Sequence, residues 1–198
     1  AMTPRTARVS IMFANNETGT IMPVQEIGAI CRQKGVLFHT DGVQAVGKIP
    51  IDLKKLPVDI LSLSGHKLNT PKGIGAQFIR KGTKLSPLLH GGAQERSRRA
   101  GTENIPYIIG LGKACEIARR DFAKRHEYLQ GLRDRLQEGI FRKIPHVELN
   151  GHPTQRLPNT LNVSFLYVEG ESLLLNMDLE GIAVSSGSAC SSGSADAS

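Results

Sequence analysis

Lys67 is the residue whose setting in this sequence most favours chemistry. It follows an apolar run that ends at Leu63 and the three residues Ser-Gly-His, and it precedes the turn Leu-Asn-Thr-Pro-Lys-Gly. A lysine amine held in a partly desolvated pocket can lose its proton and form an imine with an aldehyde. A lone lysine is usually a solvated charge, so this interpretation depends on the residues that the fold brings to it.

Other polar residues follow two further apolar runs. Asp41 and Gln44 come after one run, and Asn15 comes after another. Ligands of parallel α/β sheets bind beyond the carboxyl ends of the strands, so we expect these residues to converge with Lys67. A lone Asp after a strand is usually a helix cap. An Asp held against a ring nitrogen is also what pyridoxal phosphate needs, because its protonated ring acts as an electron sink.

Ser64 and His66 lie on either side of Gly65, directly before the lysine. A hydroxyl, an imidazole and the backbone amides beside a glycine supply the directional donors that a phosphate dianion needs. The sequence therefore predicts a phosphate subsite next to the reactive amine.

The three cysteines differ in their surroundings. Cys190 lies in a small, polar tract of Ser, Gly and Ala, which suits a thiol that must move better than a core cysteine. Because an ordinary thiol is only a few per cent thiolate at about pH 7, Cys190 needs local activation or a base on the substrate. Cys31 and Cys115 lie on helical patterns, where a buried cysteine acts as a small hydrophobe, and we expect both to be structural. Such scattered cysteines do not favour a disulfide framework or a metal site.

These candidates depend on an alternation of strands and helices. The pattern predicts a helix that begins at Pro23 and stops at Gly35. Apolar runs predict strands over residues 9–14, 36–39, 58–63 and 75–79. Strands that alternate with helical crossovers indicate an α/β fold with a mostly parallel sheet. The segment between the last two runs is too short for a helix, so we expect at least one antiparallel strand.

The second half of the chain has a different pattern. From Ile108 to Ile140, apolar residues recur at helical spacings among charged ones, which predicts one long amphipathic helix. After it we expect a smaller α+β unit, with strands over 147–149, 159–166 and 181–184 and a helix over 171–179. We therefore divide the chain into a cofactor-binding portion over 1–107, a connecting helix over 108–144 and a smaller domain over 145–198.

The composition bears on several classes of protein. The 198 residues carry a formal charge of +7, from 25 Lys and Arg against 18 Asp and Glu, yet only 5% are aromatic and the basic residues are spread out. This favours a solvated basic surface over nucleic-acid binding. No run approaches the roughly 20 apolar residues of a membrane span, so we expect a cytoplasmic protein that acts away from membranes.

Four stretches carry a resemblance to a known family. They read HTDGVQAVGKIPID, LSLSGHKLNTPKGIGA, HGGAQERSRRAGTEN and SSGSACSSGS, in this order. The chain resembles the cysteine desulfurases, which are pyridoxal-phosphate enzymes of the class V aminotransferase group, and it is most similar to the branch with a long cysteine loop. The resemblance covers essentially the whole chain. It implies the fold type I architecture of pyridoxal-phosphate-dependent transferases, with a large-domain portion and a smaller C-terminal α+β domain, both incomplete.

The resemblance assigns five residues to the cofactor. It implies that Lys67 binds pyridoxal phosphate covalently and shuttles protons, and that Asp41 pairs with the pyridine nitrogen. Gln44 would contact the phenolic oxygen, and Ser64 and His66 would hold the phosphate.

It also implies roles for three further residues. Asn15 would touch the cofactor and the substrate carboxylate. Thr102 would reach the phosphate of the partner subunit, which implies a homodimer. Cys190 would be the mobile nucleophile that takes sulfur from L-cysteine as a persulfide and leaves L-alanine. The persulfide would pass to an iron–sulfur scaffold protein or another sulfur-acceptor protein, such as a tRNA-thiolation relay.

The chain differs from this family in extent. Members carry a segment before the position of Val9, with a glycine-rich loop and a histidine that stacks on the pyridine ring, and a later strand with an arginine that binds the substrate carboxylate. No residue of this chain matches these parts, so we expect it to be a fragment. Two alternatives stay open: an inactive fragment that acts at most as a dimerising or partner-binding module, and a selenocysteine lyase, which shares these motifs.

Overall fold

The computed structural model of the chain describes residues 2–187, which form two compact units. The first unit takes in the described residues up to Ala14 and the segment Met22–His126. The second takes in Asn15–Ile21 and the described residues from Glu127 onward. The functional domain boundaries expected after residues 107 and 144 stay a prediction.

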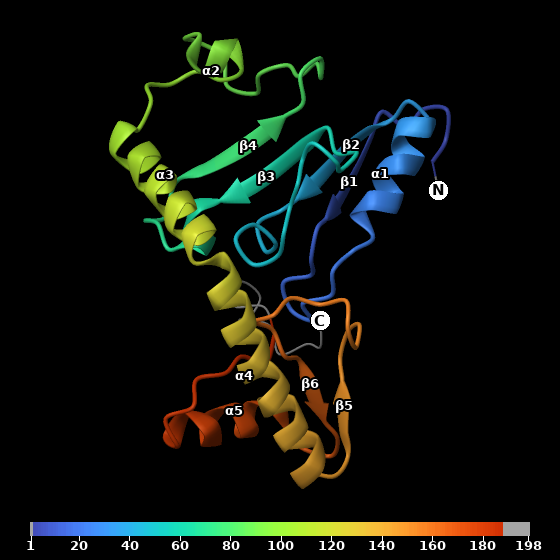
Figure 1. Cartoon of the computed structure of the whole chain (residues 1–198), viewed down its shortest axis with the longest axis vertical. Helices are drawn as coiled ribbons and strands as arrows, with labels where there is room; N and C mark the ends of the chain where they lie inside the picture. The colour runs from blue at the N-terminus through green and yellow to red at the C-terminus, as the bar shows by residue number, and fades with distance from the viewer. Residues whose placement is uncertain (1, 188–198) are drawn as a thin grey trace. The chain divides into compact units, whose positions relative to one another are not determined.

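A four-stranded sheet forms the centre of the first unit (Figure 1). Its strands lie in the order β1-β2-β3-β4, with the bounds β1 Arg8–Met12, β2 Leu37–Asp41, β3 Ile60–Ser64 and β4 Gly75–Ile79. β1, β2 and β3 are parallel to one another, and β4 is antiparallel to β3. This confirms the predicted α/β fold with a mostly parallel sheet and the predicted antiparallel strand.

The pairing register brings the carboxyl ends of the three parallel strands to one edge of the sheet. Met12 is paired with Asp41, and Asp41 is paired with Ser62, which lies two residues before the end of β3. The turns that follow β2 and β3 therefore lie side by side, as ligand-binding turns do in open parallel sheets.

Helix α1 (Val24–Gln33) covers one face of the sheet and buries Gly28 and Cys31. A Cβ on Gly28 would lie 3.1 Å from the ring of Phe38, so the helix and β2 are in direct contact. The helix stops where Gly35 takes a φ of +65°, a conformation that glycine adopts without strain. Both the predicted helix and the burial of Cys31 are confirmed. The core of this unit includes the buried side chains Phe13, Phe38, Ala45, Val58, Ile60 and Leu61.

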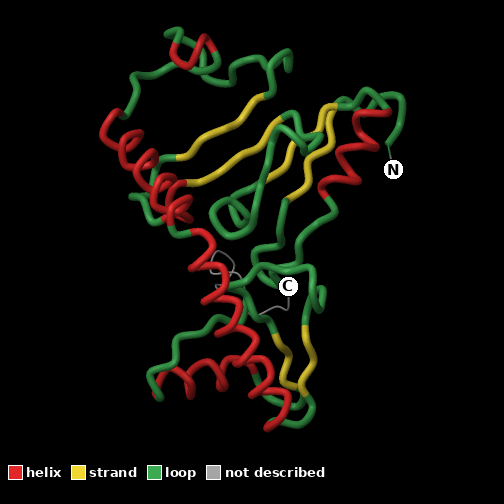
Figure 2. Tube along the Cα trace, viewed as in Figure 1, coloured by secondary structure: helices red, strands yellow, loops and turns green. Residues whose placement is uncertain are grey.

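Two helices stand where the sequence predicts one (Figure 2). They are α3 (Ile105–Arg120) and α4 (Phe122–Lys143), and Asp121 separates them with φ −97° and ψ 5°. The Asp121 carboxylate accepts two N–H groups of Arg120 at 2.7 and 2.8 Å. The prediction of a single helix is wrong at this residue, because the apolar spacing continues across the break. No helix within residues 2–187 is both long and apolar enough to cross a membrane.

Cys115 lies on the surface of α3, and the prediction that it is buried is wrong. Leu111, one turn earlier, is the buried residue of this helix. Cys115 instead lines an apolar groove of about 430 Å³ together with Leu68 and Phe122. The helical spacing identified the apolar face correctly but could not show that the groove over it is open.

The second unit contains a two-stranded antiparallel sheet of β5 (Val147–Leu149) and β6 (Val163–Phe165), followed by α5 (Gly170–Leu179). The strand predicted over 159–166 thus forms only in its last part, and the strand predicted over 181–184 is absent, because no described strand pairs with it. The Glu169 carboxylate caps α5 by accepting the N–H groups of its first turn.

Candidate active site

Asp41 ends β2 with an exposed carboxylate. Its Oδ1 atom accepts the backbone N–H of Val43 at 2.9 Å, which fixes the side chain at the start of the following turn. The N–H of Gly42 donates to the carbonyl of Ser62 at 2.9 Å and ties this turn to β3. The local hydrogen bonds therefore hold the carboxylate at the carboxyl edge of the sheet, where a ligand can reach it.

The predicted phosphate subsite lies where β3, which ends at Ser64, meets the short 3-10 helix η1 (Gly65–Leu68). Ser64 Oγ lies 2.7 Å from His66 Nδ1, so the two predicted phosphate ligands are in direct contact. A Cβ on Gly65 would collide with the side chain of Thr70, which is why glycine is required here. The N–H of Gly65 also donates to the carbonyl of Ile74 at 2.8 Å and fixes the turn against the start of β4.

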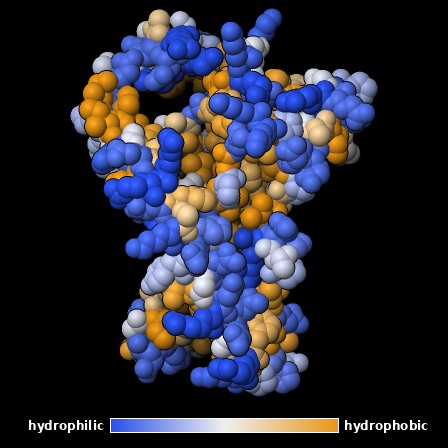
Figure 3. Space-filling view, in the orientation of Figure 1, coloured by the Kyte–Doolittle hydropathy of each residue, from blue (hydrophilic) through white to orange (hydrophobic). Residues whose placement is uncertain are grey.

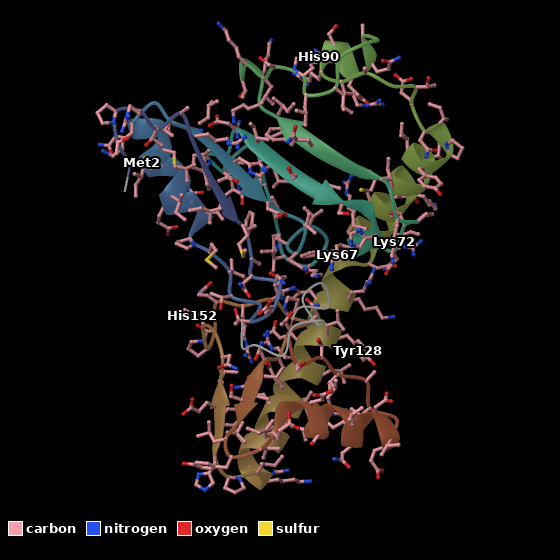
Figure 4. All side chains as sticks on the ribbon, turned by 180° about the vertical axis from the view of Figure 1, so that it is seen from behind. Met2, Lys67, Lys72, His90, Tyr128 and His152 are labelled. Atoms are coloured by element: carbon pink, nitrogen blue, oxygen red, sulfur yellow. The ribbon has the colours of Figure 1, made fainter. Side chains whose placement is uncertain are left out.

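Lys67 lies on η1 with an exposed side chain, and η1 contacts α3 (Figure 4). Its positive charge acts on Lys48, which belongs to the turn after β2. Burial, followed by the charge of Lys67, lowers the pKa of the Lys48 amine from its ordinary value. The two turns therefore bring two amines into electrostatic range of each other at this edge of the sheet.

Gln44 and Lys48 are joined by a side-chain hydrogen bond within the turn after β2. The Nζ atom of Lys48 donates to Gln44 Oε1 at 2.8 Å. The sequence indicated Gln44 as a site residue but did not indicate Lys48. The available signal was their spacing of four residues, which brings two side chains to the same side of a helical turn.

His39 is another residue near this edge of the sheet that the sequence did not indicate. Its Nδ1 lies 2.7 Å from the hydroxyl of Ser10 on β1, and its Nε2 lies 2.9 Å from the hydroxyl of Ser62 on β3. Burial, then the charge of Arg8, lowers the pKa of His39, and Asp41 opposes this shift. Because side chains alternate along a strand, His39 shares a face of the sheet with Asp41, opposite the buried Phe38.

Three further residues are predicted for the site: Asn15, Thr102 and Cys190. Asn15 belongs to the second unit, where its Oδ1 accepts the N–H groups of Glu17 and Thr18 at 2.9 and 2.8 Å. Thr102 is exposed in the loop before α3, in the first unit. Cys190 lies outside the described residues. Their roles at a common site stay predictions.

The side chains on the two neighbouring turns have the chemistry that pyridoxal phosphate requires. Asp41 offers a carboxylate for a ring N–H, Gln44 offers an amide, and Lys67 offers an exposed amine for an aldehyde. Ser64 and His66 offer a hydroxyl and an imidazole in contact with each other for a phosphate. Among residues 2–187, no group of three or more His, Cys, Asp or Glu side chains could hold a metal ion. The carboxylate, amide, amine and Ser64–His66 pair together suit an organic phosphate with an aldehyde group.

Several curated proteins with similar sequences are cysteine desulfurases. The chain is 60% identical over 193 residues to the cysteine desulfurase IscS of Methanosarcina thermophila, which covers 98% of this chain and 48% of the relative. It is 56% identical over 198 residues to a cysteine desulfurase of Gluconacetobacter diazotrophicus, which covers 100% of this chain and 50% of the relative. The chain thus spans about half the length of the curated relatives that it matches.

The fold agrees with these similarities. A solved structure of a NifS-like protein superimposes with a TM-score of 0.86 at 42% identity, over 93% of this chain and 50% of that one. The family model for class-V aminotransferases matches residues 1–197, which is nearly the entire sequence. This chain belongs to the aminotransferase class-V family.

Proposed function

We propose that the protein is a pyridoxal-phosphate-dependent cysteine desulfurase, which converts L-cysteine to L-alanine and carries the sulfur as a persulfide on Cys190. The observation that carries this proposal is the placement of Asp41, the Ser64–His66 pair and Lys67 on two neighbouring turns at the carboxyl edge of the sheet. The similarity to curated desulfurases over the whole of this chain supports it.

The residues of this chain would divide the work of binding. The Asp41 carboxylate would accept the ring N–H of the cofactor and keep the ring protonated, and the Gln44 amide would donate to its phenolic oxygen. One proton lies in the hydrogen bond between Ser64 Oγ and His66 Nδ1. The pair has one further donor, either the N–H at His66 Nε2 or the O–H of Ser64, and this group would donate to the phosphate. When bound, pyridoxal phosphate supplies an electron sink for the α-carbon of the substrate.

Lys67 and Cys190 would carry the proton and the sulfur. Lys67 would hold the cofactor through its amine, release it to the substrate amine, and move the α-proton. The thiolate of Cys190 would attack the substrate sulfur, so that a sulfur–sulfur bond forms as the carbon–sulfur bond breaks. The electron pair of the broken bond remains on the substrate carbon, which is protonated to give alanine. An iron–sulfur scaffold or another sulfur-acceptor protein would then receive the terminal sulfur.

A homodimer is part of this proposal. Thr102 is exposed in the loop before α3, and the first turns of α3 expose Ile105 and Ile109. Figure 3 shows the hydrophobic surface over this end of the helix. Large exposed apolar side chains in one place are typical of a protein interface, and here they adjoin the residue expected to reach the partner's phosphate. The cytoplasmic location stays a prediction.

The test is cofactor binding followed by turnover. The protein is mixed with pyridoxal phosphate, the visible absorbance band is recorded, and alanine and sulfide are measured with cysteine and with selenocysteine as substrates. Lys67→Ala should abolish the band, whereas Lys72→Ala, which removes another exposed lysine shortly after η1, should retain it. Turnover of selenocysteine alone would replace the desulfurase proposal with a lyase.

The alternative is an inactive module that dimerises or binds a partner. The chain spans only about half of its curated relatives. If the 198-residue chain has a folded circular-dichroism spectrum but shows no band and no turnover, activity is excluded for this chain and the family assignment stands.

A further inference from the structure

We propose that Lys48 is a positioning residue, which fixes the side-chain amide of Gln44 so that its NH₂ group is presented to the ligand. This inference rests on the proposed function, because the ligand atom that Gln44 serves is the phenolic oxygen of pyridoxal phosphate. Lys48 itself touches neither cofactor nor substrate in this proposal.

The contact between the two side chains settles which way the amide points. Ordinarily the oxygen and nitrogen of a glutamine amide are assigned from the hydrogen-bond network. An ammonium group has three donors and no acceptor, so Lys48 can bond only the oxygen of Gln44. The distance of 2.8 Å from Nζ to Oε1 is that of a charge-assisted hydrogen bond. The Nε2 atom is thereby left to donate to a ligand oxygen.

The backbone of Lys48 is held from two sides. Its N–H donates to the carbonyl of Ala45 at 3.0 Å within the turn. Its carbonyl lies 2.9 Å from Nδ1 of His126, in the first turns of α4. A carbonyl can only accept, so this contact places the proton of His126 on Nδ1. Lys48 is therefore anchored to a helix, and the contact with Gln44 does not depend on a free loop.

The surroundings of Lys48 leave few other roles for its charge. Its side chain is half-buried, and within residues 2–187 no carboxylate lies within salt-bridge distance of it. Burial and the charge of Lys67 both act against the ammonium form. A half-buried ammonium whose bonded partner is an amide oxygen costs folding free energy. The presence of this half-buried lysine is explained if its role is to orient the amide of Gln44.

The first test needs no cofactor. In the apoprotein, the heteronuclear NOE of the Gln44 side-chain amide should show an ordered group, and Lys48→Met should lower it toward the value of the exposed Gln33 in the same spectrum. Lys48→Arg keeps a charged donor and should preserve the order. Lys54→Met, at an exposed lysine of the next segment, is the matched control and should have no effect. An unchanged Gln44 signal in Lys48→Met overturns the proposal.

The second test measures the visible absorbance band of the protein with pyridoxal phosphate bound. A donor to the phenolic oxygen stabilises its negative charge and weakens its hold on the neighbouring proton. Lys48→Met should therefore raise the pH midpoint of the visible band by about one unit, since a hydrogen bond to a charged group changes an equilibrium about tenfold. Cofactor affinity should fall by a similar factor, and Lys48→Arg should restore both values.

A double-mutant cycle separates positioning from the charge of Lys48 itself. In a Gln44→Met background, Lys48→Met should have no further effect on the midpoint if it acts through Gln44. A full additional shift in that background overturns the positioning role. If the wild-type protein shows no band with pyridoxal phosphate, the proposed function fails. The NOE of the Gln44 side-chain amide then shows, without any cofactor, whether Lys48 orients that amide.

Discussion

The Nε2 atom of His39 lies 2.9 Å from the hydroxyl oxygen of Ser62 and joins the central strand β2 to β3. The other nitrogen of the ring reaches Ser10 on β1 at 2.7 Å, and Gln77 on β4 donates to Ser62 at 3.4 Å. One imidazole is thus the centre of a row of polar side chains that crosses all four strands. The row lies on the face opposite α1, on the side where Asp41 ends β2.

His39→Leu should lower the free energy of unfolding by about 0.5–1.5 kcal/mol at pH 8, because it removes the hydrogen bonds between the imidazole and the hydroxyls of Ser10 and Ser62. The loss should be smaller at pH 5. The pKa of His39 in the folded protein lies below its ordinary value of 6.5, so its stabilisation is present above that pH and is lost as the pH falls through the folded pKa. Chemical denaturation at several pH values checks both statements.

The control for His39 is His90→Leu, at an exposed histidine of the same unit. Its unfolding curves should match those of the wild type at pH 8. A difference between His39→Leu and the wild type that grows as the pH falls would contradict the assignment of a neutral, hydrogen-bonded imidazole.

The cysteines of the first unit should react at very different rates. Burial, and secondly the charge of Asp59, raises the pKa of the Cys31 thiol, and its side chain is fully enclosed. Cys115 is exposed on α3. Iodoacetamide at pH 7.5 should therefore label Cys115 and leave Cys31 unlabelled, as measured by mass spectrometry of the two peptides. Equal labelling of the native protein would show that the packing of α1 on the sheet does not protect Cys31, and unfolding in guanidinium supplies the fully labelled reference.

The sequence predicted those elements of the fold whose ends are marked by residues within the element itself. The helix that stops at Gly35 was predicted because a proline and a glycine mark its two ends. The end of α3 at Arg120 was missed, because an apolar pattern does not reveal one residue that pairs with its neighbour. The strand expected over 181–184 is absent because a strand needs a partner that no local pattern supplies.

The residues of the candidate site also differ in how far the sequence could predict them. A general rule for parallel sheets predicted that Asp41 and Lys67 lie close together, and the register brings the carboxyl ends of β2 and β3 to the same edge of the sheet. Lys48 and His39 were missed because each acts through a hydrogen bond to another side chain. The contact of His39 with Ser62 depends on the register of β2 against β3, which the residues of either strand alone do not show.

Two glycines in helices should respond oppositely to alanine. Gly28→Ala would place a Cβ against the carbonyl and ring of Pro57 and 3.1 Å from Phe38, so it should lower the free energy of unfolding by about 1–3 kcal/mol. Gly110→Ala on α3 meets no atom within 4 Å, and it should raise that free energy by about 0.5–1 kcal/mol through helix propensity. Urea unfolding of both variants checks the pair, and a neutral Gly28→Ala would show that α1 can move away from β2.

Removing the charge of Lys67 should raise the pKa of Lys48. Burial is the larger cause of the lowered pKa and persists in Lys67→Met, so the pKa should recover only in part. Neutralising a neighbouring ammonium removes the repulsion that disfavours the charged form, which gives the shift its sign. NMR titration of the Lys48 side chain in the apoprotein measures it, with Lys72→Met as the control. If the pKa of Lys48 is the same in Lys67→Met and in the wild type, the two amines are too far apart to interact. The proposal that Gln44 and Lys67 belong to one site would then lose its electrostatic support.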